Sequence, residues 1–370
     1  MKTVAIWVTA LLAGCSSCAG EGPQAEMDAA PDADADADGD ADTDVDTTWD
    51  AGPLTPCAED AGVGAPDFVC IPGGSYLMGC MPYDTQCTEE ELPRVVVKLS
   101  PFWIDKKEAT YADLLPFLNH LASLGPEAGV ECGFSGCVYV IGEWPYPVIF
   151  VAYSHGDEQF IEMNDAGVFE WSWESYFEDE CKWVVPETPA GGLGWWGAKL
   201  FCEWRGMRLP TEAEWEAAAR GRTQLVWPCA AGGIGCFDAE FGQCNPGDEC
   251  ADPEKYNCCV PVNNPGWCVS PDGVIGAAGN AAEWVLDWGT LGTGHEWCAD
   301  GCEDPKPRQG NRAVFKGGKV HSDVESTRVS SREALLYNET AYNGSQDTGV
   351  RCVKSAVSHA LADGGVDWAE

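Results

Sequence analysis

The sequence predicts an α+β domain that is rich in loops and disulfides. Three observations predict it. Short strand-like segments bounded by Gly and Pro, such as Phe68–Gly79, alternate with a few amphipathic helices. The chain contains 20 cysteines. Residues 221–272 are rich in Gly, Pro, Asn and Cys, and a loop of that length in a compact domain is either functional or held by disulfides. We expect this domain to span residues 65–355, followed by a tail over 356–370.

The N-terminus predicts a lipoprotein leader. Thr3–Leu12 is an apolar stretch too short for a membrane-spanning helix, which needs about 20 residues, but long enough for a signal peptide. Leu12-Ala13-Gly14-Cys15 resembles a bacterial lipobox, so we expect cleavage after residues 1–14 and lipidation of Cys15. Ser16 indicates anchoring in the outer membrane of a Gram-negative bacterium. The alternative is an ordinary signal peptide with an incidental Cys15.

Residues 15–64 are predicted to form an acidic, disordered tether. Between Lys2 and Arg94 there is no Lys or Arg, and Asp28–Asp50 has repeated Asp-Ala steps. Like charges repel, and little apolar surface is available for burial. Asp34-Ala35-Asp36-Ala37-Asp38-Gly39 resembles the first half of a calcium loop, but Val45 stands where the loop requires a bidentate Glu. The tether is the preferred interpretation.

The charge of the whole chain excludes one class of partner. The formal net charge is −39, whereas phosphate binding requires a cationic face, so we expect no nucleic-acid partner. An anionic exterior is typical of a soluble surface protein with weak affinity for divalent cations.

The cysteines indicate an oxidising, extracytoplasmic compartment. Without Cys15 and Cys18, eighteen remain, an even number. Among these eighteen, Cys-x-x-Cys zinc spacing is absent, and the overall connectivity stays open. Short gaps predict five local disulfides: Cys80/Cys87, Cys132/Cys137, Cys229/Cys236, Cys244/Cys250 and Cys298/Cys302.

Strands are predicted early in the domain. Phe68–Gly79 has the pattern strand, tight turn, strand, and Arg94–Leu99 and Phe102–Asp105 are further short strands. Ile161–Trp171 predicts a hairpin that turns at Asn164-Asp165-Ala166-Gly167.

Three helices are predicted. Thr110 is a suitable N-cap for a helix that ends at Leu124. A second helix covers Trp195–Trp204. Thr211-Glu212-Ala213-Glu214 is a capping box that begins the third, because Thr and Glu satisfy each other's free amides.

Several short motifs follow one another along the domain: Ile71-Pro72-Gly73-Gly74, Pro101-Phe102-Trp103-Ile104-Asp105, Glu108-Ala109-Thr110, Phe201–Glu216, Gly279-Asn280-Ala281-Ala282-Glu283-Trp284, Lys316-Gly317-Gly318 and Gly349-Val350-Arg351-Cys352. Taken in this order, they resemble the motifs of the formylglycine-generating-enzyme, or sulfatase-modifying-factor, family, and the matching segments extend over about residues 67–353. The resemblance implies an elaborated C-type-lectin-like fold.

The resemblance also implies structural roles for several motif residues. We expect Trp204, Trp215 and Trp284 to be core or packing residues rather than platforms for a ligand. Arg208 and Glu214 are expected to form an internal ion pair. The resemblance further implies a disulfide between Cys202 and Cys352, because these positions pair in family members that have this bond.

Copper-dependent chemistry is not expected. The family's oxidases hold Cu(I) between two cysteines just after the Gly-Gly motif. The corresponding segment here, Gly317–Arg332, contains no cysteine.

The same segment is the candidate ligand loop. His321, Asp323 and Glu325, with Arg328 and Arg332, are its polar residues. The first three residues have the donor types of a facial metal site, but a solvated loop is the preferred interpretation. The family's iron-dependent branch needs a separate His-rich helical domain, for which this chain has no room.

Calcium is the cofactor that the resemblance implies most directly. One site corresponds to Gly276, Gly279, Ala281 and Glu283, with Gly276 standing where the family usually has Asn or Asp. A second site corresponds to Asn245, Glu254 and the carbonyls of Pro246 and Tyr256.

Two functional hypotheses follow. The preferred one is a lipid-anchored surface protein with a non-catalytic binding or structural role in the envelope, whose partner is a glycan or an envelope protein. The alternative is a metal-dependent oxidase of the formylglycine-generating or non-haem-iron type with a divergent active site.

Overall fold

The computed structural model describes residues 52–58, 67–133, 136–141, 144–146, 161–171, 185–229, 234, 262, 268–290, 292–299, 301–320, 322–336 and 348–356. All of them belong to one compact unit, Thr47–Glu370. The leader and most of the tether lie outside the described residues. Among the helices that are described, none is long and apolar enough to span a membrane.

A four-stranded sheet carries the central motifs. Its order is β13 (Glu333–Leu336), β12 (Arg312–Lys316), β10 (Ala282–Gly289) and β14 (Thr348–Gly349). Within this sheet, the β10–β14 pair is parallel and the other two pairs are antiparallel. Glu283 lies opposite Lys316 in the β10–β12 register. The Gly-Asn-Ala-Ala-Glu-Trp and Lys-Gly-Gly motifs are thereby brought side by side.

Two three-stranded sheets each combine two N-terminal strands with one strand from late in the chain. One has the order β1–β4–β15 and the other β11–β3–β2. β1 and β2 follow one another in the chain, as the sequence predicts, but they enter different sheets. The bounds are β1 Phe68–Ile71, β2 Gly74–Met78, β3 Val95–Leu99, β4 Phe102–Asp105, β11 Cys302–Glu303 and β15 Val353–Ser355.

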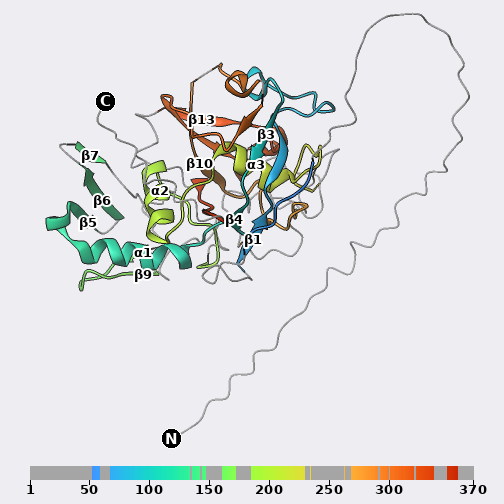
Figure 1. The fold of residues 1–370 in the computed structure, drawn as a ribbon. Coiled ribbons are helices and arrows are strands. Elements are labelled where there is room, and N and C mark those ends of the chain that lie inside the picture. The colour runs from blue at the N-terminus through green and yellow to red at the C-terminus, as the bar shows by residue number, and fades with distance from the viewer. Residues whose placement is uncertain are drawn as a thin grey trace, which may run out of the picture. The chain divides into compact units, whose positions relative to one another are not determined.

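The remaining strands form two small sheets close to α1. The predicted hairpin is present as the β8–β9 pair, with Met163 opposite Phe169. Figure 1 shows β9 running alongside α1, with β5 at one end of the helix. The bounds are β5 Val130–Gly133, β6 Gly136–Ile141, β7 Trp144–Tyr146, β8 Ile161–Met163 and β9 Phe169–Trp171.

The three predicted helices are confirmed as α1 (Tyr111–Leu124), α2 (Trp195–Trp204) and α3 (Glu212–Arg220). Thr110 and Thr211 are N-caps, each in a full capping box that satisfies free amides of the first turn. Short 3₁₀ turns complete the elements: Glu89–Glu91 (η1), Pro126–Ala128 (η2), Glu296–Cys298 (η3) and Val324–Thr327 (η4).

Two apolar clusters form the core. α1 and α2 pack with β10 in the first, and α3 packs against β2, β3 and β12 in the second. Every residue of α3 is buried, including three glutamates and one arginine. Because buried charges require partners, several ion pairs of the core form around this helix.

The three tryptophans predicted to be core or packing residues are of both kinds. Trp215 and Trp284 are fully buried, and the indole of Trp284 donates to the Leu193 carbonyl at 2.8 Å. Trp204 is 40% exposed and is a packing residue at the edge of the core. It is the last residue of α2, and one side of its ring packs on Phe117 while the rest faces solvent.

Disulfides close several loops. Three of the predicted local pairs are present: Cys80–Cys87, Cys132–Cys137 and Cys298–Cys302. Cys57–Cys70 and Cys202–Cys352 are two further bonds. The second of these ties α2 to the segment after β14, as the family resemblance implies.

One predicted disulfide was wrong. Cys229 pairs with Cys268 instead of Cys236, across a sequence separation of 39 residues. The fold brings the two ends of the long 230–267 segment together, so the nearest cysteine in sequence is not the partner. Cys236, Cys244 and Cys250 lie outside the described residues.

Candidate functional site

The segment after the Gly-Gly motif begins with a sharp turn. Gly317 and Gly318 have φ values of 92° and 70°, which favour glycine. A Cβ on Gly318 would lie 2.9 Å from Thr327 Cγ2. The turn leads into η4, which Asp323 caps by accepting from the Ser326 amide at 2.8 Å.

Arg328 anchors this segment to the loop before β3. Its guanidinium donates to both carboxylate oxygens of Glu91, at 2.7 and 2.9 Å, and to Asp84 Oδ2 at 2.6 Å. Burial would raise the pKa of Glu91, but hydrogen bonds from Arg328 and Ser330 outweigh it and lower that pKa. Arg328 is therefore an internal clamp.

Arg332 is buried as well. Its Nη1 donates to the Thr293 carbonyl at 2.9 Å, and its Nε lies 3.2 Å from Glu212 Oε1. Of the other candidate loop residues, Asp323 is exposed and Glu325 is half-buried, while His321 lies outside the described residues. The two arginines of the candidate ligand loop thus face the core, and only its first half offers polar groups to solvent.

A second cluster of polar side chains lies between α3, β12 and η3. Glu212, Glu216 and His295 are buried, and one donor atom from each lies within 4.8 Å of the others. These are the residue types of a metal site. Among the described residues, neither ring nitrogen of His295 has a hydrogen-bond partner. Burial lowers the pKa of His295, so the imidazole is neutral.

Lys316 occupies the place that a metal would take between the two carboxylates. Its ammonium lies 2.8 Å from Glu216 Oε1, 3.5 Å from Glu212 Oε1 and 3.2 Å from the Ser330 carbonyl. Arg308 and Arg332 also pair with Glu212. Burial would raise the pKa of Glu212, but these three cations lower it strongly. The carboxylates are already neutralised, so the group does not fit a divalent metal.

The turn to which the resemblance assigns calcium is built around Glu283 and Arg351. Glu283 accepts from Arg351 Nη2 at 2.7 Å, from its Nε at 2.9 and 3.0 Å, and from the Trp215 indole at 2.7 Å. Both carboxylate oxygens are thus occupied by donors. Gly276 supplies no side-chain oxygen, and with Gly279 it has the positive φ that its turn requires.

Glu108 is the residue at this turn that sequence reasoning missed. Its carboxylate accepts from the Asn280 side-chain amide at 3.0 Å and from the Ala281 amide at 3.1 Å. Burial, with the nearby charge of Glu283, raises the pKa of Glu108 to about 8. The signal was present, because Glu108 opens the Glu-Ala-Thr motif.

The donors at this turn do not fit the implied calcium site as it stands. Both oxygens of Glu283 are paired with donors, and the raised pKa of Glu108 disfavours its ionised form at neutral pH. Calcium binding here therefore requires Glu108 to ionise or Glu283 to exchange its partner. Asn245, Pro246, Glu254 and Tyr256, the second implied calcium site, lie outside the described residues.

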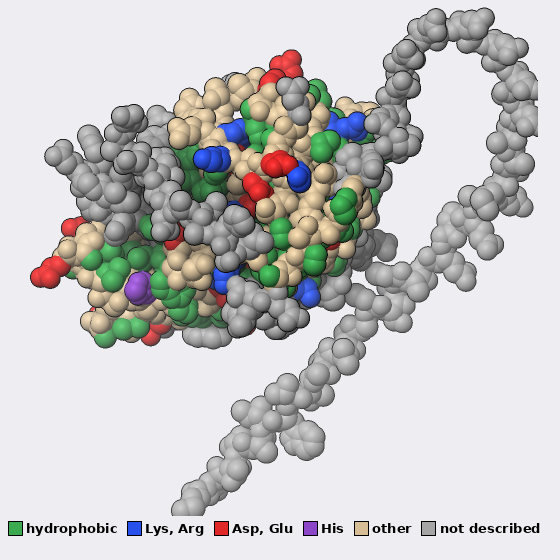
Figure 2. All heavy atoms as spheres, in the orientation of Figure 1, with side chains coloured by type: hydrophobic (Ala, Val, Ile, Leu, Met, Phe, Trp, Pro, Cys, Tyr) green, Lys and Arg blue, Asp and Glu red, His purple; other side chains and the backbone are tan. Residues whose placement is uncertain are grey.

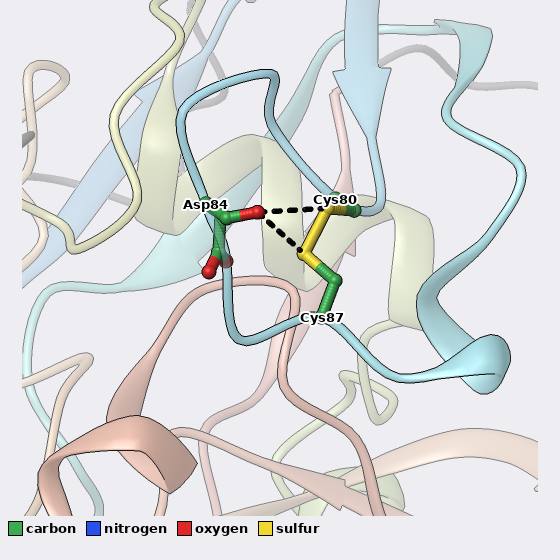
Figure 3. Close-up of side chains that lie close together, drawn as sticks. All are labelled: Cys80, Asp84 and Cys87. Atoms are coloured by element: carbon green, nitrogen blue, oxygen red, sulfur yellow. Dashed lines mark hydrogen bonds between the residues drawn. A yellow bond between two sulfur atoms is a disulfide. The ribbon is translucent and has the colours of Figure 1, made fainter.

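The described residues also do not fit a two-thiolate copper site. Every described cysteine is in a disulfide, and the segment 319–332 has none. Cys80, Asp84 and Cys87 lie close enough to share a metal ion, but Figure 3 shows that the two sulfur atoms are bonded to each other.

Arg208 and Glu214 form the internal ion pair that was expected. Two guanidinium nitrogens donate to the two carboxylate oxygens, each at 2.6 Å. On the face shown in Figure 2, acidic and basic side chains of the described residues are interspersed and form no large patch of one sign.

Comparison with known proteins agrees with this architecture. A model of the family described as "Sulfatase-modifying factor enzyme 1-like domain" matches residues 56–356. Formylglycine-generating enzyme from Thermomonospora curvata is 28% identical over 315 residues, which cover 78% of this chain and 93% of that protein. "Inactive C-alpha-formylglycine-generating enzyme 2" from Mus musculus is 30% identical over 167 residues, which cover 42% of this chain and 48% of that protein.

The solved structure of PvdO from Pseudomonas aeruginosa has a similar fold. Its TM-score is 0.51 at 17% identity, and the match covers 83% of this chain and 100% of that one. At that identity the likeness concerns the fold alone. With the family model matched over nearly all of the described residues, the chain belongs to the family of sulfatase-modifying factor enzyme 1-like domains, with an elaborated C-type-lectin-like fold.

Proposed function

We propose that this chain is a lipid-anchored, extracytoplasmic protein whose family domain has a non-catalytic binding or structural role in the envelope. The observation that carries the proposal is the composition of the segment after Gly317-Gly318. It lacks cysteine, and Arg328 and Arg332 hold its second half against buried carboxylates. A segment fixed in this way offers no soft donors for copper.

Membership of the family does not by itself require activity. One relative is named an inactive formylglycine-generating enzyme. The other polar group with metal-binding residue types, Glu212, Glu216 and His295, is neutralised by Lys316 and two arginines. This observation weighs against the alternative of an oxidase with a divergent metal site.

The metal content of the purified, oxidised domain tests the non-catalytic role. The domain over residues 52–370 is analysed for bound elements by mass spectrometry, followed by oxygen consumption with thiol substrates. We expect neither stoichiometric copper nor iron, and no oxygen uptake above the buffer rate. One copper or iron per chain, with thiol-dependent oxygen uptake, would replace this proposal by the oxidase alternative.

Lipid anchoring is tested separately. Cells that express the full chain are labelled with radioactive palmitate, and Cys15→Ser is compared with Cys18→Ser as the matched control. We expect label in the wild type and in Cys18→Ser, and none in Cys15→Ser. Label retained in Cys15→Ser would contradict attachment at Cys15.

The partner of the binding role is proposed to be a glycan or an envelope protein. The domain is screened against immobilised glycans and, in a second arm, cross-linked to its neighbours in intact envelopes. Saturable binding to a glycan class, or one reproducible cross-linked protein, identifies the partner. If both arms are negative, a binding role is excluded and the structural role remains.

A further inference from the structure

The Cys80–Cys87 disulfide lies in a surface loop between β2 and η1. Both cysteines are half-buried, and most residues between them, including Tyr83 and Gln86, are exposed. Cys202 and Cys352, in contrast, are fully buried. A small thiol reagent therefore has access to the first disulfide in the folded protein but not to the second.

The two sulfur atoms of this disulfide have different surroundings. Arg328 Nη1 lies 3.7 Å from Cys87 Sγ. Cys80 Sγ lies 3.5 Å from the Met81 carbonyl oxygen and 3.8 Å from the Asp84 carbonyl oxygen. The Asp84 carbonyl faces both sulfur atoms, as Figure 3 shows, so the guanidinium is what distinguishes Cys87.

A guanidinium beside a sulfur atom stabilises a thiolate there, whereas carbonyl oxygens accept a hydrogen bond from a thiol. Cys87 is thus suited to be the leaving group when the bond is broken, and Cys80 to be the sulfur atom that is attacked. Since a stabilised leaving thiolate accelerates exchange, the asymmetry sets a direction for the reaction.

The same loop holds Arg328 in place. Besides Glu91, the guanidinium contacts the Asp84 carboxylate at 2.6 Å and the Gln86 carbonyl at 3.0 Å. Asp84 and Gln86 lie inside the ring that the disulfide closes. The state of the Cys80–Cys87 bond is therefore linked through Arg328 to residues 322–332.

We propose that Cys80–Cys87 is a thiol–disulfide exchange site for a dithiol reductant, and that its redox state controls how firmly Arg328 holds the segment 322–332. The inference is independent of the proposed function, because it needs neither a ligand nor a lipid anchor.

The exchange has two steps. A thiolate of the reductant attacks Cys80 Sγ, the bond between the cysteines breaks, and its electron pair leaves on Cys87 Sγ, so that a mixed disulfide joins the reductant to Cys80. The second thiol of the reductant, after losing its proton, attacks its own mixed disulfide and releases Cys80, which takes up one proton. The reductant ends as a disulfide, and the protein has gained two electrons as a Cys80 thiol and a Cys87 thiolate.

The test uses the full folded chain with dithiothreitol as the probe. Samples are quenched with iodoacetamide over time, and peptide mass spectrometry follows each disulfide separately. We expect Cys80–Cys87 to be reduced at least about tenfold faster than Cys202–Cys352 and faster than Cys298–Cys302. Reduction of Cys80–Cys87 at the rate of Cys202–Cys352 would overturn the proposal.

The asymmetry gives a second readout. After reduction, alkylation near pH 6 is expected to modify Cys87 about tenfold faster than Cys80, because only Cys87 has a guanidinium partner. Equal rates at the two cysteines contradict the assigned leaving group. Arg328→Lys, which keeps the charge but loses the bidentate geometry, is expected to reduce the preference.

Amide hydrogen exchange tests the link to the segment 322–332. On reduction of Cys80–Cys87, we expect faster exchange over residues 322–330 and unchanged exchange over α1. A Cys80→Ser/Cys87→Ser variant should show the same pattern without reductant. Unchanged exchange over 322–330 in both samples would contradict the control of Arg328 by this disulfide.

Discussion

Lys316 Nζ lies 2.8 Å from Glu216 Oε1, and both side chains are completely buried. The pair connects β12 to α3, and Glu216 Oε2 in turn accepts from the Gly79 amide at 2.9 Å. Three segments far apart in the chain therefore meet at one ion pair. A buried charge without its partner is costly, so removing either side chain should lower the free energy of unfolding strongly.

Replacement of Lys316 by Met is expected to destabilise the domain by roughly 3–5 kcal/mol, because it leaves Glu216 without its ammonium. Lys98→Met is the matched control. Lys98 pairs with Glu303 at the surface, where solvent screens the pair, so its loss should leave the stability nearly unchanged. The free energies of unfolding are measured by urea denaturation. Equal effects of the two variants would refute the importance of the buried pair.

The contribution of Glu108 to the stability is expected to fall as the pH rises from about 4.5 to 8. Glu108 has a pKa of about 8 in the folded protein against an ordinary 4.5, so folding keeps a proton that the unfolded chain releases. This contribution is complete below pH 4.5 and lost as the pH rises through 8. Above that pH the loss amounts to roughly 5 kcal/mol.

Glu108→Gln should flatten this part of the profile, because the amide does not titrate. The measurement is the unfolding free energy at several pH values for both proteins. Calcium provides a further check, since it favours an ionised carboxylate. If calcium binds at this turn, it should stabilise the wild type more at pH 8 than at pH 5, and should do so less in Glu108→Gln.

Cys202→Ala/Cys352→Ala is expected to lower the stability by roughly 4–5 kcal/mol, because the bond closes a separation of 150 residues. Thermal unfolding under non-reducing conditions gives the difference. Cys298→Ala/Cys302→Ala, which opens a separation of 4 residues, should have a smaller effect. The reverse order would contradict the loop-closure argument.

Trp284→Ala is expected to cost roughly 3–5 kcal/mol, since a buried indole that also donates a hydrogen bond is removed from the core. Trp204→Ala should cost about 1 kcal/mol, because much of that ring already faces solvent. Both variants are compared with the wild type by chemical denaturation. Similar losses would place Trp204 in the core after all.

The sequence was informative where local chemistry determines structure. The capping boxes at Thr110 and Thr211 identified the starts of α1 and α3, since each N-cap satisfies amides within its own first turn. The order of motifs identified the family and its fold. These features depend on residues close together in the chain.

Long-range relationships were predicted less well. The pairing of Cys229 with Cys268 depends on where the fold brings the ends of a long segment, which spacing does not reveal. Arg328 and Arg332 are charged, so the sequence alone favours a place at the surface. Only the tertiary structure shows that they form ion pairs with Glu91 and Glu212. The raised pKa of Glu108 likewise results from burial against β10.

The Cys202–Cys352 bond has a consequence for how the protein responds to a protease. A protease that cuts the backbone once anywhere between residues 203 and 351 produces two fragments that remain covalently joined. The ion pairs and sheet contacts between the fragments then stay within one molecule, so cleavage does not dilute them. A nicked chain should therefore run at full length on a denaturing gel until a reductant is added.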